Sequence, residues 1–530
     1  MKKLVNWWKQ DKRDIILLKA VLMALLPVVC CLVACAVQGR SIGQVYLPGS
    51  EWNDELFYFK QVEGIVNYGY PQGYFGFNES HALKLSFAAW SPVLVFPWIL
   101  WGLIFGWNLM SPVICNILLL TAAMFLFVWL VKPSWKQLGV LTLLFCLYTP
   151  FTRYMLSGMP EIICMSMLIV FYGTAVSYLK RETAGKLVWL FVISGLLTLM
   201  RPYMLLFMLL PVFLWVRKNG WKGLLGSAAV LGAVGISYAL IKHYLGAEYF
   251  APLFFTEWIT TFFDKGIGAG IHNFFGTLYW MGKSFLSHTV QGFRSGLASG
   301  AFFGGYLVMM AVLLWQTASD FTKWRNLKTR KEGLGRQLLV EGHLAFCFVG
   351  MLFALLLMYK LTEGSKHLLT FLAVGIFVVS LMETRFYKKA VLLGAVFAYL
   401  YTYMAVDPYD YQIPFVDQER KQQVEEWQET LGSKLILAEE NTPSYENVVI
   451  WVLNDTTPEG NVNTKWQLLY ALPEGFGISC CEGKYVAEQF ASLQSRYIAA
   501  PASGTVAELC AQAGYLELHR DRDMVLYERR

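Results

Sequence analysis

Residues 88–131 read AAWSPVLVFPWILWGLIFGWNLMSPVICNILLLTAAMFLFVWLV and contain no Asp, Glu, Lys or Arg. About 20 consecutive apolar residues are enough for a helix to cross the hydrocarbon core of a bilayer. The stretch is long enough for two crossings, but Pro92 and Pro97 interrupt its first half. Whether that first half crosses the membrane decides on which side every later loop lies.

The rest of the chain has a similar composition. Of its 530 residues, 56% are hydrophobic and 15% are charged, whereas an ordinary soluble domain has about 25% charged residues. We therefore expect an α-helical polytopic membrane protein. The net charge of +7 requires no nucleic acid as partner, because Lys and Arg enrich the cytoplasmic loops of membrane proteins. Seven of the ten cysteines lie in apolar runs, where Cys behaves as a small hydrophobe; one disulfide involving Cys510 stays open.

The apolar runs predict about eleven membrane spans. The basic start of the chain resembles a signal peptide, but the apolar run Ile15–Val37 is longer than a typical signal segment. We interpret it as an uncleaved first span with the N-terminus inside. The further predicted spans are Leu109–Val131, Lys136–Phe151, Ile162–Leu179, Leu187–Met200, Tyr203–Val216, Leu224–Leu245, Leu297–Thr317, Leu338–Tyr359, Leu368–Met382 and Ala390–Met404.

The basic residues between these spans support that count. Eleven spans place five basic breaks on the side of the N-terminus, as the positive-inside rule demands. These breaks are KPSWK, LKRETAGK, RKNGWK, TKWRNLKTRKEGLGR and ETRFYKK. The count requires residues 88–108 to lie as an aromatic helix at the outer interface, where Trp and Tyr are enriched. As a true span, that segment would make twelve in all and put the C-terminus inside.

With eleven spans, residues 1–404 form the membrane domain and three features face outward. These are the first outer loop 38–108, the long outer loop 246–296, which either covers a site or lies at the interface, and the tail 405–530. The tail has the strand-like runs NVVIWVL and SRYIAA, the helix-like GTVAELCAQAG and a closing MVLYERR. This pattern predicts a small extracytoplasmic α/β domain. We expect an integral protein of the bacterial cytoplasmic membrane, surrounded by membrane lipids.

Ionisable residues gather at the outer ends of the predicted spans, where such groups usually mark a pathway or a site. They are Asp54, Glu55, Arg153, Glu161, Arg201, Lys360, Glu363, Lys366 and His367. A carboxylate near several cations suits a reaction on a phosphorylated lipid. The cations would hold the phosphate, and the carboxylate would take a proton from an acceptor hydroxyl. Glu79 and His81 are ordinary ligand types for a divalent ion.

The order of these motifs resembles the GT-C superfamily of polytopic membrane glycosyltransferases, which includes the protein O-mannosyltransferases and the lipid A aminoarabinose transferases. The resemblance covers roughly residues 15–400. It rests on the first span followed by NDELFYF at 53–59, SPVLVFPWILWGLIFG at 91–106, SGMPE at 157–161 and GSKHLL at 364–369.

This resemblance implies an inverting transferase of cell-envelope glycan biosynthesis. It would move a hexosyl or pentosyl group from a polyprenyl-phosphate donor to a glycan, lipid or protein acceptor on the extracytoplasmic face. Asp54 matches the catalytic base, and Glu55 matches the second letter of an Asp-Glu pair. The first loop lacks the Asp-x-Asp of metal-dependent members, so we expect no required cofactor, and a divalent metal ion at Glu79 and His81 stays open.

Each candidate also has a purely structural interpretation. An acid such as Glu55 or Glu161 is favoured at a helix start by the helix dipole, and Arg201 can extend to the membrane interface. Our hypothesis gives catalysis to Asp54 and Glu55. Donor phosphate binding falls to Arg201, Lys366, His367 and Arg153, and acceptor binding or a second acid to Glu161. Two other classes stay open: a lipid-linked glycan polymerase or ligase, and a lipid-linked sugar transporter or flippase without chemistry.

Overall fold

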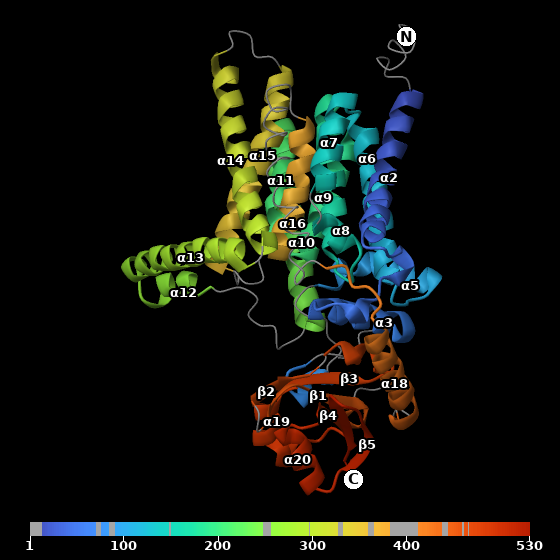
Figure 1. Ribbon diagram of the computed structural model, residues 1–530. Coiled ribbons are helices and arrows are strands. Elements are labelled where there is room, and N and C mark those ends of the chain that lie inside the picture. The colour runs from blue at the N-terminus through green and yellow to red at the C-terminus, as the bar shows by residue number, and fades with distance from the viewer. Residues whose placement is uncertain are drawn as a thin grey trace.

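The computed structural model shows a bundle of long apolar helices with a smaller α/β domain at one end (Figure 1). It describes residues 13–69, 76–83, 91–147, 150–246, 256–295, 297–326, 332–358, 365–381, 412–436, 444–457, 460–464 and 466–529. Among these residues, five helices are long and apolar enough to cross a membrane. The predicted fold class, a polytopic α-helical membrane protein with a small C-terminal α/β domain, is confirmed.

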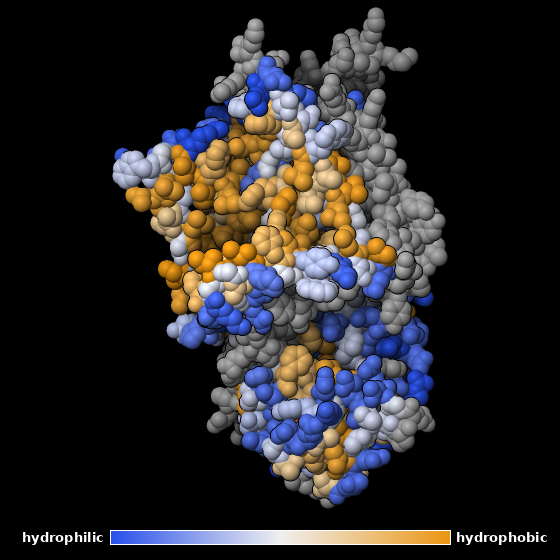
Figure 2. All heavy atoms as spheres, turned by 90° about the vertical axis from the view of Figure 1, so that its left-hand side faces the viewer, coloured by the Kyte–Doolittle hydropathy of each residue, from blue (hydrophilic) through white to orange (hydrophobic). Residues whose placement is uncertain are grey.

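The apolar side chains of the bundle helices pack against one another in its interior and are exposed on its outside. Its helices are α2 (Arg13–Val37), α6 (Ser111–Val131), α7 (Trp135–Leu147), α8 (Pro150–Met155), α9 (Glu161–Lys180), α10 (Ala184–Met200), α11 (Leu205–Leu245), α14 (Leu297–Asn326), α15 (Glu332–Met358) and α16 (Ser365–Leu381). Helix α9 is the central one, because it packs against α6, α10 and α16. On the face shown in Figure 2, a broad apolar region covers the bundle, and hydrophilic side chains gather at its far end and on the α/β domain.

Helix α11 comprises two antiparallel arms. Gly220 has φ 57° and ψ −133°, which is not helical and is readily reached only by glycine. A Cβ on Gly223 would lie 2.6 Å from the carbonyl oxygen of Trp215, whereas a straight helix would separate these positions by about 12 Å. The chain therefore reverses at Gly220, in agreement with the two predicted spans Tyr203–Val216 and Leu224–Leu245.

The proline-aromatic segment does not form a long helix. Its helix α5 (Phe96–Phe105) has ten residues and is therefore about 15 Å long, half the thickness of the hydrocarbon core. It packs against helix α3 (Asn53–Tyr68) at the end of the bundle that carries the α/β domain (Figure 1). This arrangement agrees with an interfacial helix rather than a span; the total number of spans stays a prediction.

The long outer loop contains helices α12 (Glu257–Asp264) and α13 (Ile267–Ser295). Both run across the direction of the bundle helices in Figure 1. Large apolar side chains on them are exposed, including Phe263 at 84% and Trp280 at 62%. Exposed aromatic residues on helices that lie across a bundle are typical of the membrane interface, the second of the two interpretations of this loop.

The C-terminal domain is a six-stranded mixed sheet. Its strands are β1 (Val448–Thr457), β2 (Gly460–Asn463), β3 (Gly477–Glu482), β4 (Tyr497–Pro501), β5 (Leu516–Arg520) and β6 (Met524–Glu528). Strand β1 pairs in parallel with β3 and β4 and antiparallel with β2, and β6 lies antiparallel between β4 and β5. The strands and the helix that the sequence predicts in the tail all occur.

Successive side chains of β1 point to opposite faces of the sheet, and helices cover both faces. Ile450 packs in one apolar cluster with helices α19 (Gly483–Gln489) and α20 (Thr505–Gln512). Trp451 points to the other face. The centroid of its ring lies 5.9 Å from that of Trp427 in helix α18 (Gln418–Lys434). Cys510 is a buried free thiol, as are most of the ten cysteines, none of which is in a disulfide.

The first outer loop enters this sheet. Gly76 forms a parallel bridge with Ser479 of β3, and its carbonyl accepts from the N–H of Cys480 at 2.7 Å. Helix α4 (Glu79–Ala82) follows and packs on β1 and β3. The last predicted span, Ala390–Met404, and the predicted domain boundary at 404/405 lie outside the described residues, so the domain division stays a prediction.

Candidate functional site

Helix α3 carries the predicted catalytic acids at its N-terminus. It begins at Asn53, so Asp54 and Glu55 occupy its first turn, where the helix dipole stabilises a negative charge. Asp54 is half-buried. Tyr58 lies one turn further on the same face and interacts electrostatically with Arg201 of the bundle. The part of α3 around Tyr58 therefore lies near Arg201.

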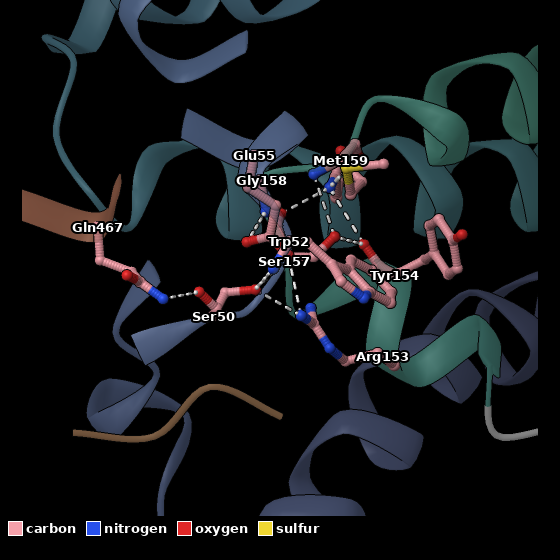
Figure 3. A network of polar contacts seen from close by, with 10 residues as sticks. Ser50, Trp52, Glu55, Arg153, Tyr154, Ser157, Gly158, Met159 and Gln467 are labelled. Carbon is pink, nitrogen blue, oxygen red and sulfur yellow. Dashed lines mark hydrogen bonds and ion pairs between the residues drawn. The ribbon is translucent and has the colours of Figure 1, made fainter. Parts of the chain in front are cut away.

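Glu55 forms a buried ion pair with Arg153 of α8. Arg153 Nη2 lies 2.9 Å from Glu55 Oε1, and the side chains are 4% and 0% exposed. Oε1 also accepts from the Ser50 hydroxyl at 3.0 Å, and Oε2 accepts from the Gly158 N–H at 3.2 Å (Figure 3). Burial raises the pKa of Glu55, and the donors Arg153, Gly158 and Ser50 act against that rise.

Trp52 and Ser50 complete the surroundings of this pair. The guanidinium of Arg153 lies 3.8 Å from the centroid of the Trp52 ring, a cation–π arrangement, and donates to the Ser50 hydroxyl at 2.9 Å. Gln467 of the C-terminal domain reaches the same place, because its amide donates to the Ser50 carbonyl at 3.4 Å (Figure 3). The residues directly before α3 are thus tied to both the bundle and the C-terminal domain.

The SGMP sequence between α8 and α9 is shaped by this contact. A Cβ on Gly158 would lie 3.1 Å from the Cβ of Glu55, so glycine permits the close approach of α3. The buried amide of Asn116 in α6 donates to the carbonyls of Ser157 at 3.2 Å and Met159 at 3.1 Å. The connection between α8 and α9 is therefore held from two sides.

A second buried cluster surrounds Arg201, directly after α10. Its guanidinium forms an ion pair with Glu161, and both side chains are 0% exposed. Arg201 Nη1 lies 2.6 Å from His367 Nδ1 and 3.1 Å from the Tyr203 hydroxyl. Because a guanidinium can only donate, Nδ1 of His367 is the acceptor in this contact.

Three of the buried polar atoms in these pairs lack a hydrogen-bond partner among the described residues. They are Nε and Nη1 of Arg153 and Oε2 of Glu161. Buried polar atoms are almost always hydrogen-bonded, and exceptions call for an explanation such as a ligand or water. Both ion pairs therefore retain capacity to bind a polar ligand.

The remaining predicted residues lie elsewhere or are only partly described. Lys366 is the second residue of α16, and its side chain lies outside the described part. The Glu79 carboxylate accepts from the backbone N–H groups of Gln494 and Ser495, which fastens α4 to the C-terminal domain. His81 lies in the same short helix. The described residues contain no group of three His, Cys, Asp or Glu suited to a metal, and metal binding stays a prediction.

Sequence reasoning missed several residues of this region. Ser50, Trp52, Asn116 and Tyr203 have no charge to distinguish them. Lys60 was missed as well, although a signal for it existed. It lies three residues before Glu63, a spacing that favours an ion pair within a helix, and the structure contains this pair at 2.7 Å.

Comparisons with known proteins concern the fold. No family model and no curated protein matches the chain. Among solved structures, it is similar to ArnT from Cupriavidus metallidurans bound to undecaprenyl phosphate, with 12% identity, a TM-score of 0.48, and coverage of 96% of this chain and 97% of that chain. The apo state of ArnT gives 12% identity and a TM-score of 0.41 at the same coverage.

Proposed function

We propose that the protein is a membrane glycosyltransferase that moves a sugar from a polyprenyl-phosphate donor to an acceptor hydroxyl. One observation carries the proposal. Asp54 lies in the first turn of α3, and Tyr58 on the same face interacts with Arg201 of the buried cluster. In the proposed site, the Asp54 carboxylate is the base and Arg201 holds the donor phosphate.

Asp54 is the proposed general base. It takes the proton of the acceptor hydroxyl while that oxygen attacks the anomeric carbon of the donor sugar. The bond from the anomeric carbon to the lipid phosphate breaks, and configuration inverts in this single displacement. Glu55 contributes indirectly, because its ion pair with Arg153 fixes the first turn of α3 in which Asp54 lies.

The Arg201 cluster is the proposed phosphate site. The departing phosphate gains negative charge as its bond breaks, and a fixed guanidinium stabilises that charge. His367 and Tyr203 hold Nη1 of Arg201 in place. Glu161 compensates the arginine charge before the donor binds. Lys366, at the start of α16, is the proposed second cation, and we propose the extracytoplasmic face as the side of the reaction.

Asp54→Asn tests this proposal. Purified protein in proteoliposomes is given a radiolabelled polyprenyl-phosphate sugar, and product formation is measured. General-base catalysis contributes about 10²–10⁴-fold, so the variant is expected to lose at least 100-fold in kcat with an unchanged unfolding temperature. Asp14→Asn is the matched control, because Asp14 is an exposed first-turn aspartate of α2. Equal rates of Asp54→Asn and wild type would contradict the proposal, and lipid transfer without product would favour a flippase.

A further inference from the structure

The segment 466–474 of the C-terminal domain lies along helix α3. Before the helix starts, the amide of Gln467 donates to the carbonyl of Ser50 at 3.4 Å. Near the middle of the helix, the ammonium of Lys60 donates to the carbonyl of Leu472 at 2.8 Å. The two contacts come from one short segment, which begins with the 3₁₀ helix η8 (Trp466–Ala471).

Two further contacts give the direction of the segment. The ring of Tyr470 lies 5.5 Å from that of Phe59, and the side chain of Asn67 forms a hydrogen bond with Glu474. Burial raises the pKa of Glu474, which lies close to Glu63 as well. Residue numbers increase together on both sides of the contact, so the segment runs parallel to α3 over most of its length.

The contacts select one face of the helix. At about 100° per residue, Phe59, Lys60, Glu63 and Asn67 centre on a direction roughly 180° away from that of Asp54. Tyr58 lies only about 40° from Asp54 by the same count, on the side of Arg201. The C-terminal domain therefore contacts the face of α3 opposite Asp54, and Asp54 lies on the side of the bundle.

Lys60 is the polar centre of this contact. Its side chain is 2% exposed and lies 2.7 Å from the carboxylate of Glu63. Lysine is almost never fully buried unless it is paired, and here the pair and the Leu472 carbonyl satisfy it within the contact. The bond from this buried ammonium to the Leu472 carbonyl favours one rotation of the helix, since turning α3 would break it and leave the ammonium with only Glu63 of its own helix.

We propose that Lys60 is a positioning residue for Asp54, through which segment 466–474 of the C-terminal domain sets the rotation of α3. This role rests on the proposed function. Loop 76–82 provides a second anchor after the helix, because Gly76 bridges to Ser479. Helix α3 is thereby fixed before, along and after its length by one domain, and that domain takes part in aligning the proposed base.

Lys60→Met in the full-length protein tests the role, because methionine keeps an unbranched apolar stem and removes the donor. A misplacement of about 1 Å at a reacting group can cost about 100-fold in rate. We expect kcat to fall about 10- to 100-fold, with the KM for the lipid donor changed less than about threefold. Lys60→Arg keeps a charged donor and is expected to restore most of the rate. Lys484→Met is the matched control, since Lys484 is 82% exposed in an ion pair on α19.

Hydrogen exchange of residues 53–68 separates this proposal from the proposed function. Lys60→Met is expected to exchange these amides faster than wild type, whether or not a substrate is turned over. Unchanged exchange, or faster exchange with an unchanged kcat, would overturn the positioning role. A wild-type protein whose activity does not depend on Asp54 would instead overturn the proposed function, and faster exchange would still identify the segment that holds α3.

Discussion

The guanidinium of Arg153 and the carboxylate of Glu55 lie 2.9 Å apart in a place that water barely reaches. Breaking such a buried pair from one side leaves an uncompensated charge and typically costs about 3–5 kcal/mol. We expect Arg153→Met to destabilise the protein by about that amount, measured by unfolding in detergent. The double variant Glu55→Gln with Arg153→Met is expected to lose less stability than the two single variants lose together.

An exposed ion pair provides the control for this prediction. Arg217 and Glu182 are 2.7 Å apart, but their side chains are 47% and 42% exposed. Exposed pairs contribute about 0–1 kcal/mol, so Arg217→Met is expected to change stability little. Equal effects of the two arginine substitutions would show that the Glu55–Arg153 pair does not stabilise the fold.

Tyr203→Phe probes the proposed phosphate site. The substitution removes the hydroxyl that accepts from Arg201 and contacts His367 while keeping the ring. Hydrogen bonds to charged groups contribute about 1.5–3 kcal/mol, so we expect undecaprenyl phosphate, used as the probe lipid, to bind about 10-fold more weakly. Tyr306→Phe is the control, because its hydroxyl donates to a backbone carbonyl elsewhere in the bundle. Unchanged affinity in Tyr203→Phe would place the phosphate elsewhere.

Cysteine labelling tests which side of the membrane carries the site. Ser41 and Ser503 are exposed near the first outer loop and in the C-terminal domain, and Asn219 is exposed at the reversal of α11. In a background without other cysteines, an impermeant reagent outside the cell is expected to label Ser41→Cys and Ser503→Cys but not Asn219→Cys. The reverse pattern would invert the topology. Ser50 is unsuitable for this measurement, because it is 2% exposed beneath the Glu55–Arg153 pair.

Asp521 makes the C-terminal domain sensitive to acid. Burial works to raise its pKa, but hydrogen bonds from Trp427, the Met524 N–H, Gln423 and the Asp523 N–H lower the pKa overall. An acid with a lowered pKa in the fold contributes stability above its unfolded pKa of about 3.9, and this contribution is lost as the pH falls through the folded pKa. We expect Asp521→Asn to unfold at a lower temperature than wild type at pH 7, and the difference to shrink as the pH falls below about 4 towards the folded pKa. Glu488→Gln, at an exposed acid of α19, is expected to show no difference at either pH.

The hydropathy of the sequence predicts the bundle closely. Predicted span Leu109–Val131 corresponds to α6, and Ile162–Leu179 to α9 within one residue at each end. Long apolar runs have few alternatives in a bilayer, because every backbone polar group must be satisfied within the helix. Strand β1 follows for a related reason, since its continuous apolar run Val448–Leu453 fits a strand in a sheet that is covered on both faces.

Pairing between distant residues could not be predicted in the same way. The sequence indicates that Glu55 and Arg153 each need a partner, but they are 98 residues apart, and nothing local selects one partner over another. We predicted that Arg153 binds phosphate, and the structure pairs it with Glu55; its role in donor binding stays a prediction. The placement of Lys60 against Leu472, 412 residues away, likewise depends on how the two domains meet.

The bridge between Gly76 and Ser479 also determines when this contact can form during translation. Ser479 follows Gly76 by 403 positions, and a stretch of this length takes roughly 20–80 s to synthesise at about 5–20 residues per second. During that time the N-terminal half of the contact has left the ribosome and its partner strand does not yet exist. The Asp54 region therefore reaches its final form only after translation is nearly complete. A nascent chain has no assembled site until the C-terminal strands have been synthesised.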